Sequence, residues 1–501
     1  MGKNILKKTC VGLLFTGIIV NAWVNDSWAT EKTVESKGQD KISLSLEDIS
    51  RIGLENNLDI QIAKYDAYIK RTGLEDSQSV FDIFLNGQAF YLNDQQNSDS
   101  SLAGTKNISN NYSLGLSKTI PTGTKLGVEV ADARSASNST FSSINPNHEA
   151  NVKFTLNQPL GSNFFGMLDR GQIKLSRLDI DNSDFSVLER IEKSLADLQK
   201  TYWQLALRLE ELNIARQMLE RSKKLYEVFA RRNKLGLVED AELFALEANL
   251  IQNNIDITIA QQQLRIAQNA LLLALNEEDF SLDIMPKSEL TGLIERLTAK
   301  DILRTAVNQR RDYKQAKNDL EIQNINLTMK QNSLWPRIDL DASFARNGLE
   351  ADQADAWQNV GEQDNPELYV GLSFSMPLEN RSARSKKQKA ENEKAKALLN
   401  LKRIEYKIIV QIKNAVDAVN MYTDKIKAQQ QILDLQEKKL AYEEKRFSNG
   451  RSDSDTLVRF QQDLLAAQRN LAQSLFAYKA ARIDLKQAAN SLLDAYWTGK
   501  L

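Results

Sequence analysis

The sequence predicts a mainly α-helical protein with a membrane-type β portion, built from an internally duplicated helix–strands–helix unit. Three observations predict this fold. One half of the chain repeats the other, apolar residues recur at the spacing of packed helices, and the segments between those helices alternate apolar with polar residues. For 501 residues, length alone suggests about three domains, but the repeat reduces them to one duplicated unit.

The chain begins with the pattern of a secretory signal. Three early lysines precede an apolar run, and Ser27-Trp28-Ala29 offers the small residues of a cleavage site. We expect residues 1–29 to form a signal peptide cleaved after Ala29, with Ala22 as the second choice. The run is shorter than the ~20 residues of a spanning helix, which argues against a membrane anchor. Residues 30–43 are expected to form an N-terminal linker.

Composition excludes several classes of function. The 65 basic and 66 acidic residues nearly cancel, so the chain lacks the basic excess of a nucleic-acid-binding protein. The single histidine, His148, lies in a polar segment and cannot make a site of several imidazoles. The single cysteine, Cys10, falls in the predicted signal peptide, so no disulfide is expected. We therefore predict no catalytic, cofactor-binding or metal-binding residues, and no enzyme.

The duplication can be followed residue by residue. Residues 188–192 correspond to 401–405, and Gly236 corresponds to Gly450. After each glycine, ten positions match in register, with steps of three and four residues that are typical of helices packed along a seam. The first repeat is assigned to 44–290 and the second to 291–497. The first stripe is Leu243, Leu246, Leu250, Asn253, Ile257, Ala260, Leu264, Ala267, Leu271 and Ala274, and the second is Leu457, Phe460, Leu464, Ala467, Leu471, Ser474, Tyr478, Ala481, Leu485 and Ala488.

Long helices precede the two glycines. No proline interrupts the sequence from 169 to 234, which predicts a helix of roughly 100 Å at about 1.5 Å per residue.

Alternation predicts β strands within about 81–158 of the first repeat and about 337–376 of the second. A soluble sandwich alternates in the same way, but the export signal and the polar helices favour a closed membrane barrel. Two core strands per repeat give four per chain, fewer than the ~8 of the smallest membrane barrels, so an oligomer is expected. A further hairpin at about 112–134 has no counterpart in the second repeat. It could extend a barrel, form an external loop or line a lumen.

The order of these features resembles the TolC-like outer-membrane factor family, the outer membrane efflux proteins, over essentially the whole mature chain. The resemblance rests on the duplication, on two strand-to-helix junctions, on Trp335-Pro336 before a strand, and on two tip sequences containing Gly236 and Gly450. The junctions are Gln158-Pro159-Leu160 and Met376-Pro377-Leu378.

The resemblance implies a homotrimer, with a twelve-stranded β-barrel in the outer membrane continued by a long α-helical barrel in the periplasm. Such a protein would be the exit duct of a tripartite efflux pump or a type I secretion system, and would conduct passively. Its partners would be outer-membrane lipid, a periplasmic adaptor (membrane fusion protein) and an inner-membrane pump or ABC transporter, with no nucleic acid. The alternative is a non-channel periplasmic coiled-coil protein with a structural or tethering role.

The resemblance also implies two site regions, at tips of about 232–240 and about 446–455. In the family the tips meet the adaptor, and a glycine allows the tight helix reversal there. The docking candidates are Leu235, Gly236, Leu237, Val238, Asn449 and Gly450.

In the family, charged side chains just after the tips narrow the periplasmic mouth. Glu242 falls where the first acid is expected, while Thr456 and Arg459 stand where the family has two aspartates. An ion-pair gate between Glu242 and an arginine is the hypothesis, and solvated charges at a helix start are the alternative. The aperture candidates are Glu242, Arg451, Asp453, Asp455 and Arg459.

Overall fold

The computed structural model describes residues 41–96, 104–292, 294–362 and 366–496, which belong to one unit of contacts. The predicted signal peptide and residues 30–40 of the predicted linker lie outside them. Residues 41–43, which the sequence analysis assigns to that linker, form part of a strand. No helix of the described residues is long and apolar enough to cross a membrane.

The long helices come in two sets of the same order. Their lengths are 11, 21, 68 and 36 residues in the first set and 11, 22, 68 and 35 in the second, as a duplicated unit should give. The helix predicted from 169 to 234 is present as α3. The first set is α1 (Leu46–Asn56), α2 (Leu58–Gln78), α3 (Met167–Lys234) and α4 (Asp240–Leu275), and the second is α5 (Ala299–Gln309), α6 (Arg311–Asn332), α8 (Arg381–Ser448) and α9 (Ser454–Ala488).

Short elements complete the helical part. β1 (Lys41–Leu44) pairs in parallel with β6 (Asp283–Pro286). Ser45 then starts α1 with a capping box, because its hydroxyl accepts from the N–H of Asp48 at 3.2 Å while the Asp48 carboxylate accepts from the N–H of Ser45 at 3.1 Å. The 3₁₀ turns are Ser79–Phe81, Phe164–Gly166 and Leu493–Ala495.

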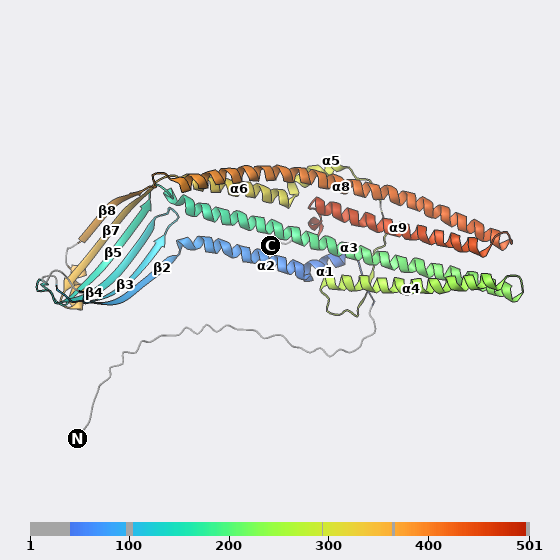
Figure 1. The fold of residues 1–501 in the computed structure, drawn as a ribbon, viewed down its shortest axis with the longest axis horizontal. Helices are drawn as coiled ribbons and strands as arrows, with labels where there is room; N and C mark the ends of the chain where they lie inside the picture. The colour runs from blue at the N-terminus through green and yellow to red at the C-terminus, as the bar shows by residue number, and fades with distance from the viewer. Residues whose placement is uncertain (1–40, 97–103, 293, 363–365, 497–501) are drawn as a thin grey trace, which may run out of the picture. The chain divides into compact units, whose positions relative to one another are not determined.

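The other six strands of the described residues form one antiparallel sheet in the order β2-β3-β4-β5-β7-β8 (Figure 1). The sequence predicts four core strands per chain, but this sheet has six. The two further strands, β3 and β4, are the hairpin predicted at about 112–134, whose position the sequence left open, and they lie between β2 and β5. The proline motifs fall at strand ends as predicted. The strands are β2 (Ile83–Asp94), β3 (Asn107–Thr119), β4 (Lys125–Ser137), β5 (Asn147–Pro159), β7 (Arg337–Glu350) and β8 (Pro366–Ser375).

A short helix that the sequence analysis did not predict, α7 (Gln353–Glu362), packs against β5 and β7. A Cβ atom on Gly348 would lie 2.1 Å from the carbonyl oxygen of Ala356, so only glycine permits this close approach. The indole Nε1 of Trp357 donates a hydrogen bond of 2.9 Å to the Asp132 carboxylate on β4. These contacts fix α7 to the sheet.

Helix packing gives this unit two unlike edges. Near the sheet, α3 lies between α2 and α6, and α6 packs on α8. Farther from the sheet, α3 lies between α4 and α9, and α9 packs on α8 (Figure 1). One edge is therefore formed by α2 and α4 and the other by α8. The core lies between the two repeats, and its fully buried side chains include Ile191, Leu195 and Tyr202 of α3 and Ile408 and Ile412 of α8.

Candidate functional site

The two helical tips are built by the same backbone motif. After α3, the N–H of Leu237 bonds to the carbonyl of Arg232 at 3.0 Å, and the N–H of Gly236 bonds to the carbonyl of Asn233 at 2.8 Å. The equivalent bonds around Gly450 measure 2.9 and 3.0 Å. Both glycines have φ of 70°, so each tip is a Schellman motif that reverses the chain between two helices.

The tips differ in the side chains that they expose. Leu235 and Leu237 are 74% and 71% exposed, although they are large apolar residues. Val238 is half-buried, because it packs against the apolar cluster where the two helical hairpins meet. Among the predicted docking residues, the first tip thus exposes a pair of leucines, whereas the second tip exposes no large apolar side chain. Gly236, Asn449 and Gly450 are exposed.

Aromatic packing joins the two tips. The rings of Phe229 and Phe447 stack with centroids 5.2 Å apart and an interplanar angle of 20°. The Arg232 guanidinium lies 4.8 Å from the centroid of the Phe447 ring, as in a cation–π contact. The tips therefore form one surface within a chain.

The predicted aperture acids lie at the starts of α4 and α9. Glu242 is exposed in the first turn of α4, and Asp455 is exposed in the first turn of α9. Asp453 caps α9, since its carboxylate accepts from the N–H of Thr456 at 2.7 Å. That hydrogen bond lowers the pKa of Asp453, so this side chain has a structural partner already.

The predicted aperture arginines are also exposed. The Arg459 guanidinium lies 5.5 Å from the ring centroid of Phe460, and Arg451 follows the second tip. Within the described part of a single chain, no ion pair joins Glu242 to Arg451 or Arg459. A gate made of these pairs would therefore have to form between copies of the chain.

The second tip contains a buried carboxylate that sequence reasoning missed. Glu443 is 4% exposed, accepts from the Ser452 hydroxyl at 2.6 Å and pairs with Arg446 at 3.2 Å. In the sequence, the only sign of this contact is that Glu443 lies three residues before Arg446, a spacing at which side chains on one helix can form an ion pair. These contacts hold the start of α9 against the end of α8.

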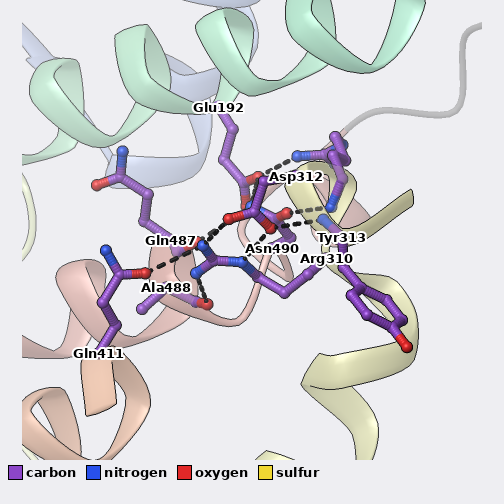
Figure 2. Close-up of polar contacts among 9 residues, drawn as sticks. Glu192, Arg310, Asp312, Tyr313, Gln411, Gln487, Ala488 and Asn490 are labelled. Carbon is purple, nitrogen blue, oxygen red and sulfur yellow. Dashed lines mark hydrogen bonds and ion pairs between the residues drawn. The ribbon is translucent and has the colours of Figure 1, made fainter. Parts of the chain in front are cut away.

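A second polar cluster joins the two repeats far from the tips (Figure 2). Glu192 of α3 is 1% exposed and forms a buried ion pair with Arg311 at the start of α6. It also accepts from Asn490 Nδ2 at 3.0 Å and from the N–H of Leu492 at 2.8 Å. Burial raises the pKa of the Glu192 carboxyl, against the opposing effect of Arg311. In the sequence, Glu192 stands out only as part of the repeated segment 188–192.

Close to this cluster, equivalent positions of the two repeats make the same kind of hydrogen bond with different side chains. Between α1 and α2, Asn57 Nδ2 donates to the carbonyl of Ala274 at 2.8 Å. Between α5 and α6, Arg310 Nη1 donates to the carbonyl of Ala488 at 2.7 Å and also binds Asp312 (Figure 2). Both bonds satisfy a carbonyl at the end of a helix.

Apolar side chains are exposed along both edges of the helical part. On α2 and α4 they recur at intervals of three, four or seven residues, so that they share one face of each helix. Exposed apolar rows of this length are typical of interaction surfaces. The rows are Leu58, Ile62, Tyr65 and Ile69 on α2, Phe244, Ile251, Ile255, Ile259, Ile266 and Leu273 on α4, and Leu399, Tyr406, Val410, Met421, Leu435 and Tyr442 on α8.

A duplicated chain that joins a strand sheet to long helical hairpins ending in glycine tips has the architecture of the TolC-like outer-membrane factors. Solved structures share this fold. The TM-score is 0.67 with CusC, at 16% identity over 91% of this chain and 95% of that chain. It is 0.66 with the CmeC outer membrane channel of Campylobacter jejuni, at 16% identity over 89% and 85%. It is also 0.66 with the outer membrane protein VceC of Vibrio cholerae, at 13% identity over 89% and 95%.

The family described as "Outer membrane efflux protein" matches residues 291–491, most of the second repeat. This match over the second repeat, together with the fold shared with the solved structures, bears out the resemblance predicted from the sequence and agrees with the predicted outer-membrane location. A comparison with curated protein sequences gives no match.

Proposed function

We propose that this protein is the trimeric exit duct of an efflux pump, conducting passively what an inner-membrane transporter delivers through a periplasmic adaptor. A type I secretion system is the second setting that the same duct would serve. The observation that carries the proposal is the pair of unlike, apolar edges, α2 with α4 on one side and α8 on the other.

Unlike edges favour a closed ring. Edge α8 of one copy can cover edge α2–α4 of the next, and such a head-to-tail contact leaves no free edge once the ring closes. The wall of the ring would then be made by α3, α4, α8 and α9 of each copy, with the glycine tips at its periplasmic end. Three copies are the number that the family resemblance implies.

The channel and its aperture are tested together by single-channel recording in planar bilayers. We expect the detergent-purified protein to be a trimer that forms ion-conducting pores. If Glu242 meets Arg459 of a neighbouring copy, Glu242→Ala and Arg459→Ala should each raise the conductance, because each removes one side of the constriction. Unchanged conductance in both variants would exclude the gate, whereas recovery of the protein in the soluble periplasm would overturn the duct.

The exposed leucine pair is the proposed adaptor-docking surface. Leu235→Asn with Leu237→Arg gives the first tip the residues found at the equivalent positions of the second tip, Asn449 and Arg451. Folding should be kept, because both tips share one backbone motif. Affinity for a purified periplasmic adaptor should fall at least ~10-fold, as expected when central apolar contacts are lost. The reciprocal variant, Asn449→Leu with Arg451→Leu, tests whether the second tip also contributes to docking, and equal affinity of all three proteins would refute this docking surface.

A further inference from the structure

We propose that the β3–β4 hairpin is part of the membrane wall, so that each chain contributes six strands and three copies close an eighteen-stranded barrel. The inference rests on the proposed trimeric duct, but it differs from the twelve strands that the family resemblance implies. The partner is a second copy of this chain, whose β8 pairs with the outer edge of β2.

The apolar face of the sheet runs without a break through the hairpin. In an antiparallel sheet, directly paired residues lie on one face. The pairings join one residue from each strand into a row across the whole sheet, and every residue of the row is apolar and exposed. Lys118 and Arg346 interrupt the neighbouring rows of this face. The unbroken row is Leu85, Leu116, Val128, Phe154, Phe344 and Leu368.

The opposite face of the hairpin is polar, as is the same face of the neighbouring strand β5, whereas β2 carries Phe84, Phe90 and Leu92 among polar residues on that face. Glu129 of β4 pairs directly with Lys153 of β5, and Ser113 of β3 pairs with Gln88 of β2. A hairpin in an external loop has no reason to match these two faces residue by residue. One apolar and one polar face, kept in register through strands of 10 to 14 residues, is the pattern of a barrel wall between lipid and water.

The width of the sheet, compared with the width of the helical layer that it joins, also favours six strands per chain. The four helices across one chain span about 36 Å at about 9 Å each. Strands about 4.8 Å apart and tilted by about 40° span about 38 Å for six and about 25 Å for four. The six-stranded sheet therefore matches the helical layer to which it is joined, and the ring can keep one diameter through both parts.

The sheet cannot end at β2 and β8 within a membrane. Within the described residues the outer edges of these two strands have no strand partner, and their backbone polar groups would be unsatisfied in lipid. Pairing β8 with β2 of the next copy satisfies both edges and continues the head-to-tail contact of the helices. Three copies of six strands give eighteen, a number at which a barrel encloses an aqueous channel.

Introduced cysteines test the position of the hairpin. The one native cysteine falls in the predicted signal peptide, so the mature chain reports only the introduced thiol. Val130→Cys and Glu129→Cys probe the two faces of β4. The matched controls are Val152→Cys and Lys153→Cys, at the β5 residues that pair directly with Val130 and Glu129. Strand β5 lies in the barrel wall whether the wall has twelve or eighteen strands. Each variant is labelled with bimane in liposomes of brominated phosphatidylcholine, and is separately treated with a charged, membrane-impermeant methanethiosulfonate.

We expect brominated lipid to quench bimane at position 130 as strongly as at position 152. We expect the charged reagent to modify position 129 as completely as position 153, and to leave 130 and 152 unmodified. Quenching at 152 but not at 130 would overturn the inference while leaving the duct intact. No quenching at 152 would instead refute the membrane sheet itself.

The copy number completes the test. Light scattering of the detergent-solubilised protein should give three copies, and a cryo-electron microscopy map should show eighteen strands. Two copies closing a twelve-stranded barrel, or three copies with the hairpin outside a twelve-stranded wall, would each overturn the inference.

Discussion

Replacing Ile255 and Ile259 with glutamate should abolish the oligomer. Both side chains are about half exposed on α4, on the edge proposed to meet α8 of the next copy. Burying an unpaired carboxylate costs several kcal/mol per ion, and a ring of three would bury six of them. We expect size-exclusion chromatography with light scattering to show a monomer in detergent, and conductance to be lost.

The control for this prediction adds the same charge elsewhere on the same helix. Asn254→Glu with Gln261→Glu changes two exposed residues, seven positions apart, on a different face of α4. This variant should remain an oligomer. If the Ile255→Glu, Ile259→Glu protein is as large and as heat-resistant as the control, the α4 edge is not an interface.

The second large effect is expected at Glu192. Glu192→Ala leaves the Arg311 guanidinium buried without its counter-charge and removes the acceptor for Asn490 and Leu492. Breaking a buried pair in this way costs about 3 to 5 kcal/mol. We expect a lower midpoint in urea unfolding, followed by circular dichroism in mild detergent. Glu192→Gln, which keeps an acceptor oxygen, should lose less, and equal midpoints for the alanine variant and the native protein would contradict the assignment.

The pH dependence of this site has a definite sign. Because burial raises the pKa of Glu192 above its ordinary value of 4.5, the folded protein keeps the proton to a higher pH than the unfolded chain. The stability that comes from protonating Glu192 in the folded state is therefore full below pH 4.5 and is lost as the pH rises through the folded pKa, above which the carboxylate is held by its pair with Arg311. The stability of the native protein relative to Glu192→Gln should fall over the same rise in pH.

The sequence predicted the repeats, the long helices and the glycine tips because each has a strong local signal. The stripes of α4 and α9 are periodic, and Gly236 and Gly450 occupy the left-handed positions that end a helix. The sheet was predicted only in part. The alternation of Leu114 and Leu116 in the hairpin indicates a strand, but its place between β2 and β5 depends on pairing with distant residues, which alternation does not encode.

Buried polar contacts were missed for a related reason. Glu192 and Glu443 each look like ordinary helix-surface carboxylates in the sequence, and α7 is too short and polar to give a clear period. The partners of Glu192, and the Ser452 partner of Glu443, lie outside the helices that carry the two carboxylates, so the folded chain identifies them; the spacing of Glu443 to Arg446 was the one signal in the sequence. The same holds for Val238, whose apolar character predicted docking but which packs partly inward.

The Glu192 cluster also bears on how the protein is made. The carboxylate receives its hydrogen bonds from Asn490 and Leu492, 298 and 300 residues later in the chain, and its ion pair from a residue 119 positions away. When the chain is made from its N-terminus, the Glu192 carboxylate therefore lacks these hydrogen bonds until residues 490 and 492 are present. A chain that is cut short before residue 490 lacks the two hydrogen bonds from Asn490 and Leu492, so its buried Glu192 carboxylate is left with fewer polar partners.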